Sequence, residues 1–326
     1  MNRINPFDEI YKLQNQGSVR SKNESLPDFP RIMDVEITNN CNYRCLMCPT
    51  GTGSQTRDKG FMSSEVYQKL IDEVSPQRTP LRFIGWGEPT LHKQWLEFLE
   101  LAKQKNILCH FNTNGTLLND RDMERIIEIG VDSLKFSFQG VDRTSYRQMR
   151  NKDNFDKVIS AIKRLFEIRG DNPYPYMHVS TTITYESPEL VSAFKEQLAW
   201  ITDKVTVGRT ILSHLNLDKV TLDDAEMEAL RALKEQESVI KEHPECPEIF
   251  DKLSINWDGS VSGCCADWDK KMVVGHIMDQ SLDRIWNSKK MTHYRTKIVN
   301  GENDQIELCR HCYDYMSLQK AGVQKT

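Results

Sequence analysis

Short apolar strands alternate with amphipathic helices along most of this chain. Apolar runs of strand length predict six strands, at residues 32–38, 81–85, 107–112, 134–138, 177–184 and 204–208. Between them, apolar residues at helical spacing predict helices at residues 63–74, 95–102, 123–129, 155–166 and 188–200. Strands that alternate with helices pair in parallel through right-handed crossovers. The predicted fold class is therefore α/β, with one sheet and helices on its outer face.

The pattern changes near residue 215. Residues 225–240 contain neither Gly nor Pro and predict a helical connector. After it, residues 253–257 and 260–264 predict a hairpin closed by the tight turn Asp258-Gly259. The predicted organisation is a flexible N-terminal segment at 1–29, a large core at 30–215, a helical linker at 216–245 and a small domain at 246–326.

The composition argues against several classes of protein. Nine cysteines in 326 residues are too sparse for a disulfide scaffold, and in a reducing compartment they favour metal ligation. No run of eighteen or more apolar residues occurs, so we expect a soluble, cytoplasmic protein without a membrane partner. A net charge of -4 with well-mixed signs gives no broad electrostatic case for nucleic-acid binding.

Three cysteines follow the first predicted strand on one short loop. Cys41, Cys45 and Cys48 are separated by three and then by two residues. A four-iron cluster prefers thiolate ligands, and three ligands on one loop leave the fourth iron open to another ligand. An open iron implies chemistry. The alternative is a zinc site, although common zinc sites pair two cysteines with a second pair on another turn.

Polar residues lie at the ends of the later predicted strands. They are Gly85-Trp86-Gly87-Glu88 on the second, Asn112 and Asn114 on the third, Ser137 on the fourth and Thr182 on the fifth. Catalytic groups of parallel α/β folds collect at the carboxyl ends of the strands, so these residues should share a rim with Cys41. Gly87 permits close backbone approach, and Glu88 can accept hydrogen bonds from an ammonium group. The alternative is that these segments are ordinary turns.

A second group of cysteines occupies the small domain. Its members are Cys246, Cys264, Cys265, Cys309 and Cys312. Four of them can hold another metal centre, which would stabilise a domain too small to stabilise itself by packing. Four thiolates also suit a structural zinc ion, and the number of ligands does not separate the two.

These motifs together resemble the radical S-adenosylmethionine (SAM) superfamily, with a SPASM or shorter "twitch" domain at the C-terminal end. The resemblance covers roughly residues 30–313 and implies a partial (β/α)6 barrel. It implies that SAM binds the open iron and is cleaved by one electron to methionine and a 5'-deoxyadenosyl radical, which removes hydrogen from a substrate C–H. Two departures from the family pattern are Met47, where an aromatic residue is frequent, and Trp86, where the family has glycine. An indole at that position could turn its ring into the pocket.

The resemblance also implies roles for individual residues. The SAM-binding [4Fe-4S] cluster would be held by Cys41, Cys45 and Cys48, and an auxiliary [4Fe-4S] cluster by Cys246, Cys264, Cys309 and Cys312. Contacts to SAM would come from Tyr43, Met47, Gly85, Gly87, Glu88, Asn112, Asn114, Ser137 and Thr182. Cys265 would be left free as a hydrogen-atom donor, as an inert thiol, or as the ligand in place of Cys264.

For the reaction, the resemblance favours a sugar or aminocyclitol enzyme that oxidises or epimerises a carbinol, because no peptide-binding domain precedes residue 30. Modification of a ribosomally made peptide is the alternative substrate class. An electron-transfer or structural iron-sulfur protein is a further alternative, but it would need neither an open iron nor a nucleotide pocket. The family implies a flavodoxin or ferredoxin as the reductant.

Overall fold

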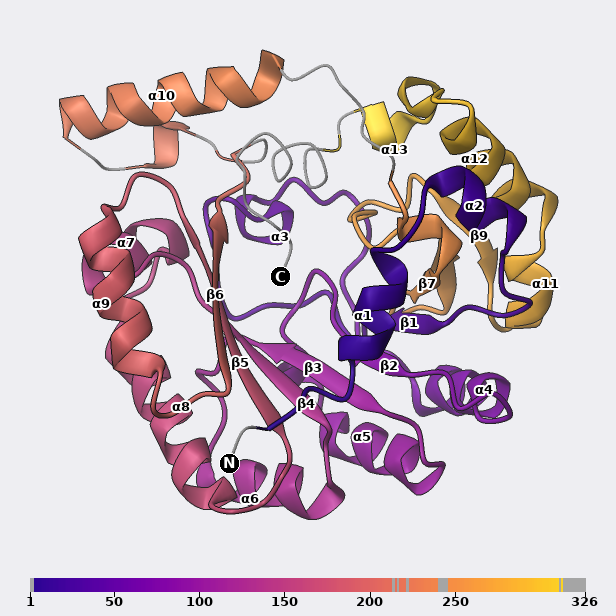
Figure 1. The fold of residues 1–326 in the computed structure, drawn as a ribbon, viewed down its shortest axis with the longest axis horizontal. Coiled ribbons are helices and arrows are strands. Elements are labelled where there is room, and N and C mark those ends of the chain that lie inside the picture. The colour runs from indigo at the N-terminus through magenta and orange to yellow at the C-terminus, as the bar shows by residue number, and fades with distance from the viewer. Residues whose placement is uncertain are drawn as a thin grey trace.

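A computed structural model of the chain describes residues 3–212, 215, 217–220, 223–239, 246–310 and 312. Within these residues one sheet has the strand order β6-β5-β4-β3-β2-β1-β7-β8-β9 and runs through the whole molecule (Figure 1). The strands are β1 (Ile32–Val35), β2 (Leu81–Phe83), β3 (Cys109–Thr113), β4 (Ser133–Ser137), β5 (Tyr176–Ile183), β6 (Lys204–Arg209), β7 (Lys252–Ile255), β8 (Ser260–Ser262) and β9 (Val273–His276).

The first six strands form the parallel part of the sheet, as the sequence predicts. Each of them pairs in parallel with its neighbour in the chain. β6 does not pair with β1, so this part is a partial, open barrel. The helices between the strands are α3 (Pro49–Thr52), α4 (Ser64–Val74), α5 (Trp95–Gln104), α6 (Asp120–Ile129), α7 (Arg143–Arg150), α8 (Phe155–Arg169) and α9 (Pro188–Leu198). Figure 1 shows α4, α5, α6, α8 and α9 along the outer side of the sheet.

Strand alternation explains why the two faces of the sheet differ. Met33 and Val35 of β1 and Phe111 of β3 are fully buried in the main core against the helices. Asp34 lies between Met33 and Val35 and points to the inner face, where Arg82 of β2 binds its carboxylate. The inner face of the barrel is therefore polar, while the outer face supplies the hydrophobic packing.

The C-terminal domain extends the same sheet. β7 pairs in parallel with β1, in a register that places Asp34 opposite Ser254. β7 and β8 form the predicted antiparallel hairpin, and Gly259 of its turn has a φ of 88°. Because β1 has partners on both sides, the barrel has no free edge there, and the second cysteine domain is joined to the core by backbone hydrogen bonds. This domain also contains α11 (Leu282–Trp286), α12 (Lys289–Val299) and α13 (Glu307–Arg310).

The N-terminal segment differs from the flexible segment that the sequence predicts. It forms α1 (Asp8–Gln14) and α2 (Val19–Glu24), drawn in indigo in Figure 1. Phe7 is fully buried with its ring 5.7 Å from that of His110 on the inner face of β3, and the Arg82 guanidinium lies 5.8 Å from the centre of the Tyr11 ring. A few aromatic anchors thus fix a segment whose overall composition is polar, and α1 covers the amino-terminal end of the barrel interior.

The predicted helical connector corresponds to α10 (Asp224–Val239), whose Leu230 packs with Leu212, Leu215 and Val220 against Leu46 of the first cysteine loop. Residues 216, 221–222 and 240–245 of this linker, and residues 311 and 313–326 of the last domain, lie outside the described residues.

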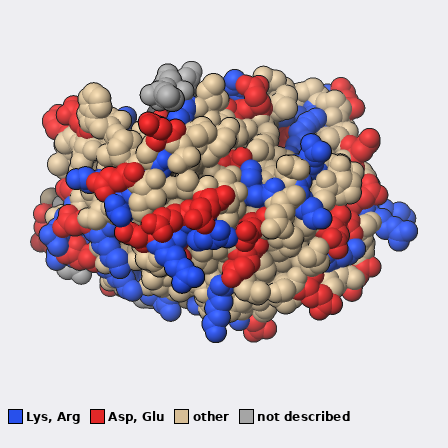
Figure 2. All heavy atoms as spheres, turned by 90° about the horizontal axis from the view of Figure 1, so that it is seen from below, with Lys and Arg blue, Asp and Glu red and all other residues tan. Residues whose placement is uncertain are grey.

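The described surface shows mixed charge. On the face drawn in Figure 2, basic and acidic side chains are interspersed among uncharged ones, and neither sign forms a broad patch. None of the helices in the described ranges combines the length and the apolar character needed to cross a membrane.

The packing of the N-terminal segment leads to a stability prediction. Phe7→Ala removes a fully buried ring and should lower the free energy of unfolding by about 3–5 kcal/mol, measured by denaturant titration. Ile4→Ala, at a side chain that is 79% exposed, is the matched control and should change it by less than about 0.5 kcal/mol. Equally small effects of both substitutions would contradict the structural role of this segment.

Candidate functional site

The first cysteine loop leaves the carboxyl end of β1 and presents its thiols among backbone donors. Cys41 and Cys48 are half-buried and Cys45 is buried. The backbone N–H of Tyr43 donates to Cys41 Sγ over 3.5 Å, and the N–H of Gly51 donates to the Cys48 sulfur. Burial raises the pKa of the Cys41 thiol to about 12, and the other two thiols add to the rise. Three mutually close thiols that accept N–H donors fit the ligand set of an iron-sulfur cluster.

Two residues that support this loop were not found from the sequence. Gly51 lies so close to Cys45 that a Cβ on it would overlap the Cys45 backbone. Arg150, at the end of α7, donates from Nη1 to Cys45 Sγ over 3.5 Å and from Nη2 to the carbonyl of Ser137. Burial opposes the charge of this guanidinium, but nearby Cys45 and Tyr146 keep its pKa above the ordinary value. Arg150 is thus a half-buried cation directed at a predicted cluster ligand.

Tyr43, predicted to contact the cofactor, packs inside the protein instead. Its side chain is 1% exposed, its hydroxyl lies 2.8 Å from that of Tyr146, and Asn154 donates to it over 2.9 Å. Met47 is half-buried on the same loop and remains available. The backbone of Tyr43 therefore supports the loop, while its ring anchors the loop to α7.

The segment Gly85-Trp86-Gly87-Glu88 folds closely over the end of β1. A Cβ on Gly85 would lie 2.6 Å from the Glu36 side chain, and one on Gly87 would overlap the carbonyl of Thr38. Both glycines are therefore required by protein packing, independently of any ligand. Trp86 donates from Nε1 to the carbonyl of Cys265 over 3.2 Å, so the indole turns toward the second cysteine loop, as the substitution at this position suggested.

Glu88 and Asn114 use their side chains within the protein. The Glu88 carboxylate accepts hydrogen bonds from the Thr113 and Thr90 hydroxyls and from Asn114 N, each over 2.7 Å, and burial raises its pKa. Asn114 Nδ2 donates to Asn42 on the first cysteine loop over 2.8 Å. The predicted ammonium acceptor, Glu88, and the predicted amide, Asn114, thus tie the ends of β2 and β3 to each other and to the cysteine loop.

The remaining predicted cofactor contacts stay at the inner rim. Asn112, Ser137 and Thr182 are half-buried on neighbouring strands. The Thr182 hydroxyl donates to Gln139 Oε1 over 2.6 Å, and Asn112 Oδ1 lies 2.8 Å from His110 Nε2. Their order along the sheet is the one expected from the sequence, and their contacts to a cofactor remain predictions.

The second group of cysteines also gathers around one region. The pKa of the Cys246 thiol is raised, mainly by burial and then by Glu248. The nearby thiols of Cys312 and Cys309 add to this rise. The pKa of Cys264 is also raised, first by contact with Cys265, then by burial and by the Cys246 thiol. The Cys264 sulfur accepts the N–H of Ala266 over 3.4 Å. The Cys265 thiol, which contacts Cys264, also donates to Glu248 Oε2 over 3.4 Å.

Four of these five thiols fit a four-thiolate site, and the choice of Cys264 over Cys265 as its ligand remains a prediction. In the part of the chain that the structure describes, no three His, Cys, Asp or Glu side chains close around a point that would hold a single metal ion. The fit to clusters rests on the donor sets and on the N–H groups directed at their sulfurs.

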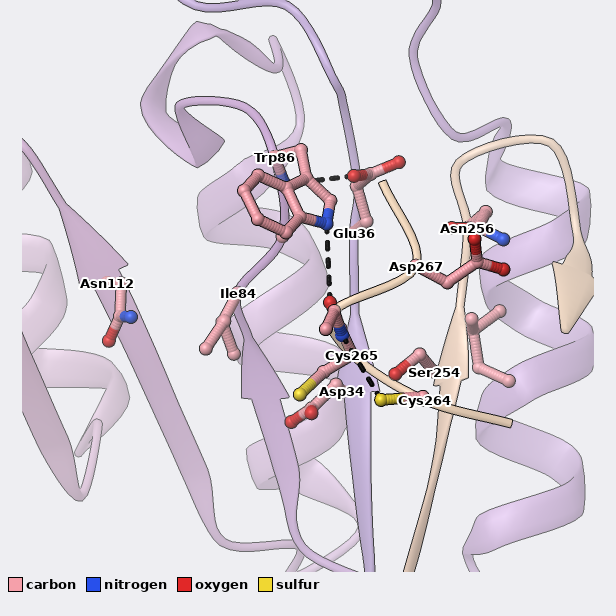
Figure 3. Close-up of a pocket in the computed structure, with 13 residues that line it drawn as sticks. Asp34, Glu36, Ile84, Trp86, Asn112, Ser254, Asn256, Cys264, Cys265 and Asp267 are labelled. Carbon is pink, nitrogen blue, oxygen red and sulfur yellow. Dashed lines mark hydrogen bonds between the residues drawn. The ribbon is translucent and has the colours of Figure 1, made fainter. Parts of the chain in front are cut away.

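A cavity of about 240 Å³ connects the strand ends with the second cysteine loop (Figure 3). Glu36, Trp86, Asn112, Ser254, Cys264 and Cys265 are among the residues that line it. Figure 3 shows Cys264, Cys265 and Ser254 together on the side of the cavity opposite Asn112. The arrangement places a cavity, whose lining carries a few polar groups on a mainly apolar surface, directly against the predicted cluster ligand Cys264 and the neighbouring thiol of Cys265.

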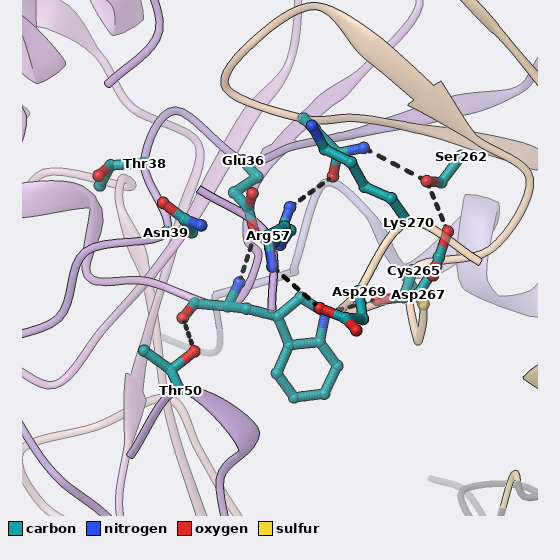
Figure 4. A network of polar contacts seen from close by, with 12 residues as sticks. Glu36, Thr38, Asn39, Thr50, Arg57, Ser262, Cys265, Asp267, Asp269 and Lys270 are labelled. Atoms are coloured by element: carbon teal, nitrogen blue, oxygen red, sulfur yellow. Dashed lines mark hydrogen bonds and ion pairs between the residues drawn. The ribbon is translucent and has the colours of Figure 1, made fainter. Parts of the chain in front are cut away.

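A chain of polar contacts joins the two cysteine loops (Figure 4). Thr50, two residues after Cys48, donates to the Trp86 carbonyl over 2.5 Å, and Trp86 N donates to Glu36 Oε2 over 2.9 Å. The same oxygen accepts Arg57 Nη2 over 2.6 Å, and Arg57 Nη1 donates to Asn256 over 3.2 Å. Each loop is thus held relative to the other by buried, directional bonds.

Charged groups continue below the cavity into the barrel. Arg82 donates to both oxygens of Asp34 over 2.7 and 2.9 Å, and Lys252 lies 3.7 Å from the same carboxylate. Lys135 extends into this region, where burial and then Arg82 lower its pKa to about 8. The interior therefore suits a polar substrate better than an apolar one.

Comparison with known proteins agrees with this architecture. The sequence matches the family model of the radical SAM superfamily over residues 35–196 and that of the SPASM iron-sulfur cluster-binding domain over residues 246–313. It is 33% identical over 294 residues to the tungsten-containing aldehyde ferredoxin oxidoreductase cofactor-modifying protein of Pyrococcus furiosus. The alignment covers 80% of this chain and 82% of that protein.

Two solved structures share the fold. BtrN in complex with AdoMet and 2-DOIA superposes with a TM-score of 0.56 and 19% identity, covering 87% of this chain and 93% of that one. Streptococcus suis SuiB bound to precursor peptide SuiA superposes with a TM-score of 0.64 and 14% identity, covering 85% and 69%. At these identities the likeness establishes the fold alone.

The position of Arg150 leads to a redox prediction. Arg150→Met removes a half-buried cation and a donor to Cys45, so the reduced cluster loses stabilisation and its midpoint potential should fall by roughly tens of millivolts. The measurement is an EPR-monitored redox titration of the reconstituted protein. Arg147→Met, on the exposed side of the same helix, is the control and should leave the potential unchanged. Equal potentials in both variants would contradict the contact.

Proposed function

This chain belongs to the radical SAM superfamily and carries a SPASM domain, and from this premise we propose that it oxidises a carbinol of a small polar substrate, a sugar or an aminocyclitol. The observation that carries the proposal is the cavity lined both by the strand ends of the radical SAM core and by Cys264 and Cys265. A substrate in this cavity would touch the auxiliary site directly.

The chain's cofactors are SAM and iron-sulfur clusters. In this proposal Cys41, Cys45 and Cys48 hold the SAM-binding cluster, and Cys246, Cys264, Cys309 and Cys312 hold the auxiliary one. When bound, SAM and its cluster supply an acceptor for a hydrogen atom, and the auxiliary cluster supplies an acceptor for an electron. The half-buried rim residues Met47, Asn112, Ser137 and Thr182 are the candidates for contacts to SAM. Gly85 and Gly87 let the neighbouring backbone approach it.

The position of Cys264 supports oxidation over epimerisation. A carbinol that becomes a carbonyl loses one hydrogen atom, one electron and one proton. The predicted ligand Cys264 lines the cavity, so the electron has a short path from substrate to auxiliary cluster. Epimerisation would instead return a hydrogen atom to the substrate, and Cys265, which also lines the cavity, is the residue placed to donate it.

Three polar groups of the cavity lining support the proposed substrate class. Carboxylate, amide and hydroxyl groups of Glu36, Asn112 and Ser254 suit a ligand rich in hydroxyl or amino groups. BtrN, whose structure was solved with AdoMet and 2-DOIA, shares the fold. The electron needed to start each turnover would come from a flavodoxin or a ferredoxin.

Two other substrate classes each have an observation in their favour. SuiB, solved with a precursor peptide, shares the fold, and a cavity of about 240 Å³ could also receive one side chain of a peptide. The Pyrococcus furiosus relative is named for modifying an enzyme cofactor and is 33% identical over most of both chains. A precursor-peptide gene beside this one would favour the first, and sugar-biosynthesis genes would favour the carbinol proposal.

The substrate proposal is tested with carbinol-deuterated sugars and aminocyclitols, SAM and a reductant. We expect deuterium in 5'-deoxyadenosine and one carbonyl formed per SAM cleaved, both measured by mass spectrometry. Deuterium transfer only from peptides, or only from a cofactor, would contradict the substrate class.

Cys265→Ala separates oxidation from epimerisation. Because oxidation needs no hydrogen donor, this variant should retain carbonyl formation within about threefold of the wild type. Cys109→Ala, at a fully buried core thiol, controls for the loss of a thiol as such. If Cys265→Ala still forms 5'-deoxyadenosine but loses the product, Cys265 is the donor and the reaction is epimerisation.

A further inference from the structure

One carboxylate oxygen of Glu36 has no hydrogen-bond partner in the part of the chain that the structure describes. Its Oε2 accepts Arg57 Nη2 over 2.6 Å and Trp86 N over 2.9 Å. Its Oε1 is buried and has no hydrogen-bond partner among the described residues, although Glu36 is only 5% exposed and lines the cavity. Arg57 and Trp86 hold the carboxylate in place, so the free oxygen has a fixed position.

Ser254, which also lines the cavity, likewise has a buried oxygen without a hydrogen-bond partner among the described residues. It lies on the inner face of β7, is 9% exposed, and its Oγ has no partner among the described residues. Ser262, opposite it on β8, accepts from Asn256 over 3.3 Å and donates to Asp267 over 2.9 Å. The lack of a partner is therefore particular to the hydroxyl that faces the cavity.

Unpaired buried polar atoms are costly, and most folded proteins contain few of them. Among the buried side-chain atoms without a partner in the described part of the chain, two belong to residues that line one cavity, Glu36 just after β1 and Ser254 on β7. The free carboxylate oxygen can only accept a hydrogen bond, and the hydroxyl can accept or donate one. A ligand that satisfies both must carry at least one N–H or O–H donor.

We propose that Glu36 Oε1 and Ser254 Oγ form a recognition site for the hydroxyl or amino groups of the substrate. The inference rests on the proposed function and deepens it, because it names the atoms that would select a polyol or an aminocyclitol. It also explains why Glu36 is buried with Arg57. The guanidinium neutralises the carboxylate and leaves one oxygen free for the ligand.

The hydrogen-bond donor to Glu36 Oε1 could also be the amino group of SAM, because Glu36 packs against Gly85, a predicted SAM contact. Ser254 lies on β7 in the C-terminal domain, outside the strands that carry the predicted SAM contacts. Separate affinities for SAM and for a substrate probe distinguish the two sources.

The test is calorimetric titration of the reconstituted holoenzyme with SAM bound and no reductant. The probes are scyllo-inositol and scyllo-inosamine, which differ by one hydroxyl replaced by an amine. Ser254→Ala removes a buried oxygen that has no hydrogen-bond partner among the described residues, so its thermal midpoint should equal that of the wild type or exceed it. We expect its affinity for both probes to fall about fivefold, and its affinity for SAM to stay unchanged.

Two further variants complete the test. Ser262→Ala removes a bonded hydroxyl on the facing strand, so it should lower the thermal midpoint and change the probe affinities less than twofold. Glu36→Gln breaks the pair with Arg57 and should lower the midpoint too, but it should weaken scyllo-inosamine about tenfold or more.

Unchanged probe affinities in Ser254→Ala would overturn the site while leaving the proposed oxidation standing. A loss of SAM affinity in Glu36→Gln without a loss of probe affinity would assign Glu36 to SAM and overturn its substrate role. No binding of either probe to the wild type at 10 mM would also overturn the inference. Because no turnover is measured, a failure of the proposed oxidation leaves these affinities interpretable.

Discussion

The parallel pairing of β1 with β7 is the constraint on which the rest of this structure depends. It makes one sheet of two domains, so the first cysteine loop at the end of β1 and the Cys264–Cys265 loop after β8 are carried by one hydrogen-bonded framework. The pairing register of two strands can change only in whole residues, so β1 and β7 hold a fixed alignment. The distance between the two predicted cluster sites is therefore set by backbone geometry, and the bonds from Trp86 to Glu36 and to Cys265 fix the loops on top of it.

The polar interior of the barrel is the second feature that shapes this structure, and it lowers the stability of the fold. The Asp34 carboxylate, Arg82 and Lys252 bury their charges where hydrophobic side chains of similar size would be at least as favourable. The α/β packing on the outer face and the aromatic anchors of α1 provide the stability that the interior does not. This division is typical of an enzyme whose substrate enters the barrel: the helices stabilise the fold, and the inner face of the sheet is free to present polar groups.

The sequence predicted the parts of this molecule that follow from local pattern. The six parallel strands, the hairpin at Asp258-Gly259 and the membership of the radical SAM superfamily were correct, because periodicity, turn chemistry and cysteine spacing are local signals. The sequence could not show that β7 pairs with β1, since a hairpin pattern carries no information about which edge it joins. The sequence analysis also missed the order of the N-terminal segment, because the packing of the Phe7 ring stabilises a segment whose composition is polar. It missed Arg150 as well, because this residue is far from Cys45 in the sequence and contacts it only in the folded chain.

The central claim is that this one sheet carries two independent iron-sulfur clusters. It is tested most directly by counting iron and sulfide per chain after anaerobic reconstitution, in the wild type and in the variant with Cys41, Cys45 and Cys48 all changed to Ala. We predict about eight irons in the wild type and about four in the variant. About four irons in the wild type and none in the variant would contradict the auxiliary cluster and direct attention to zinc at Cys246, Cys264, Cys309 and Cys312.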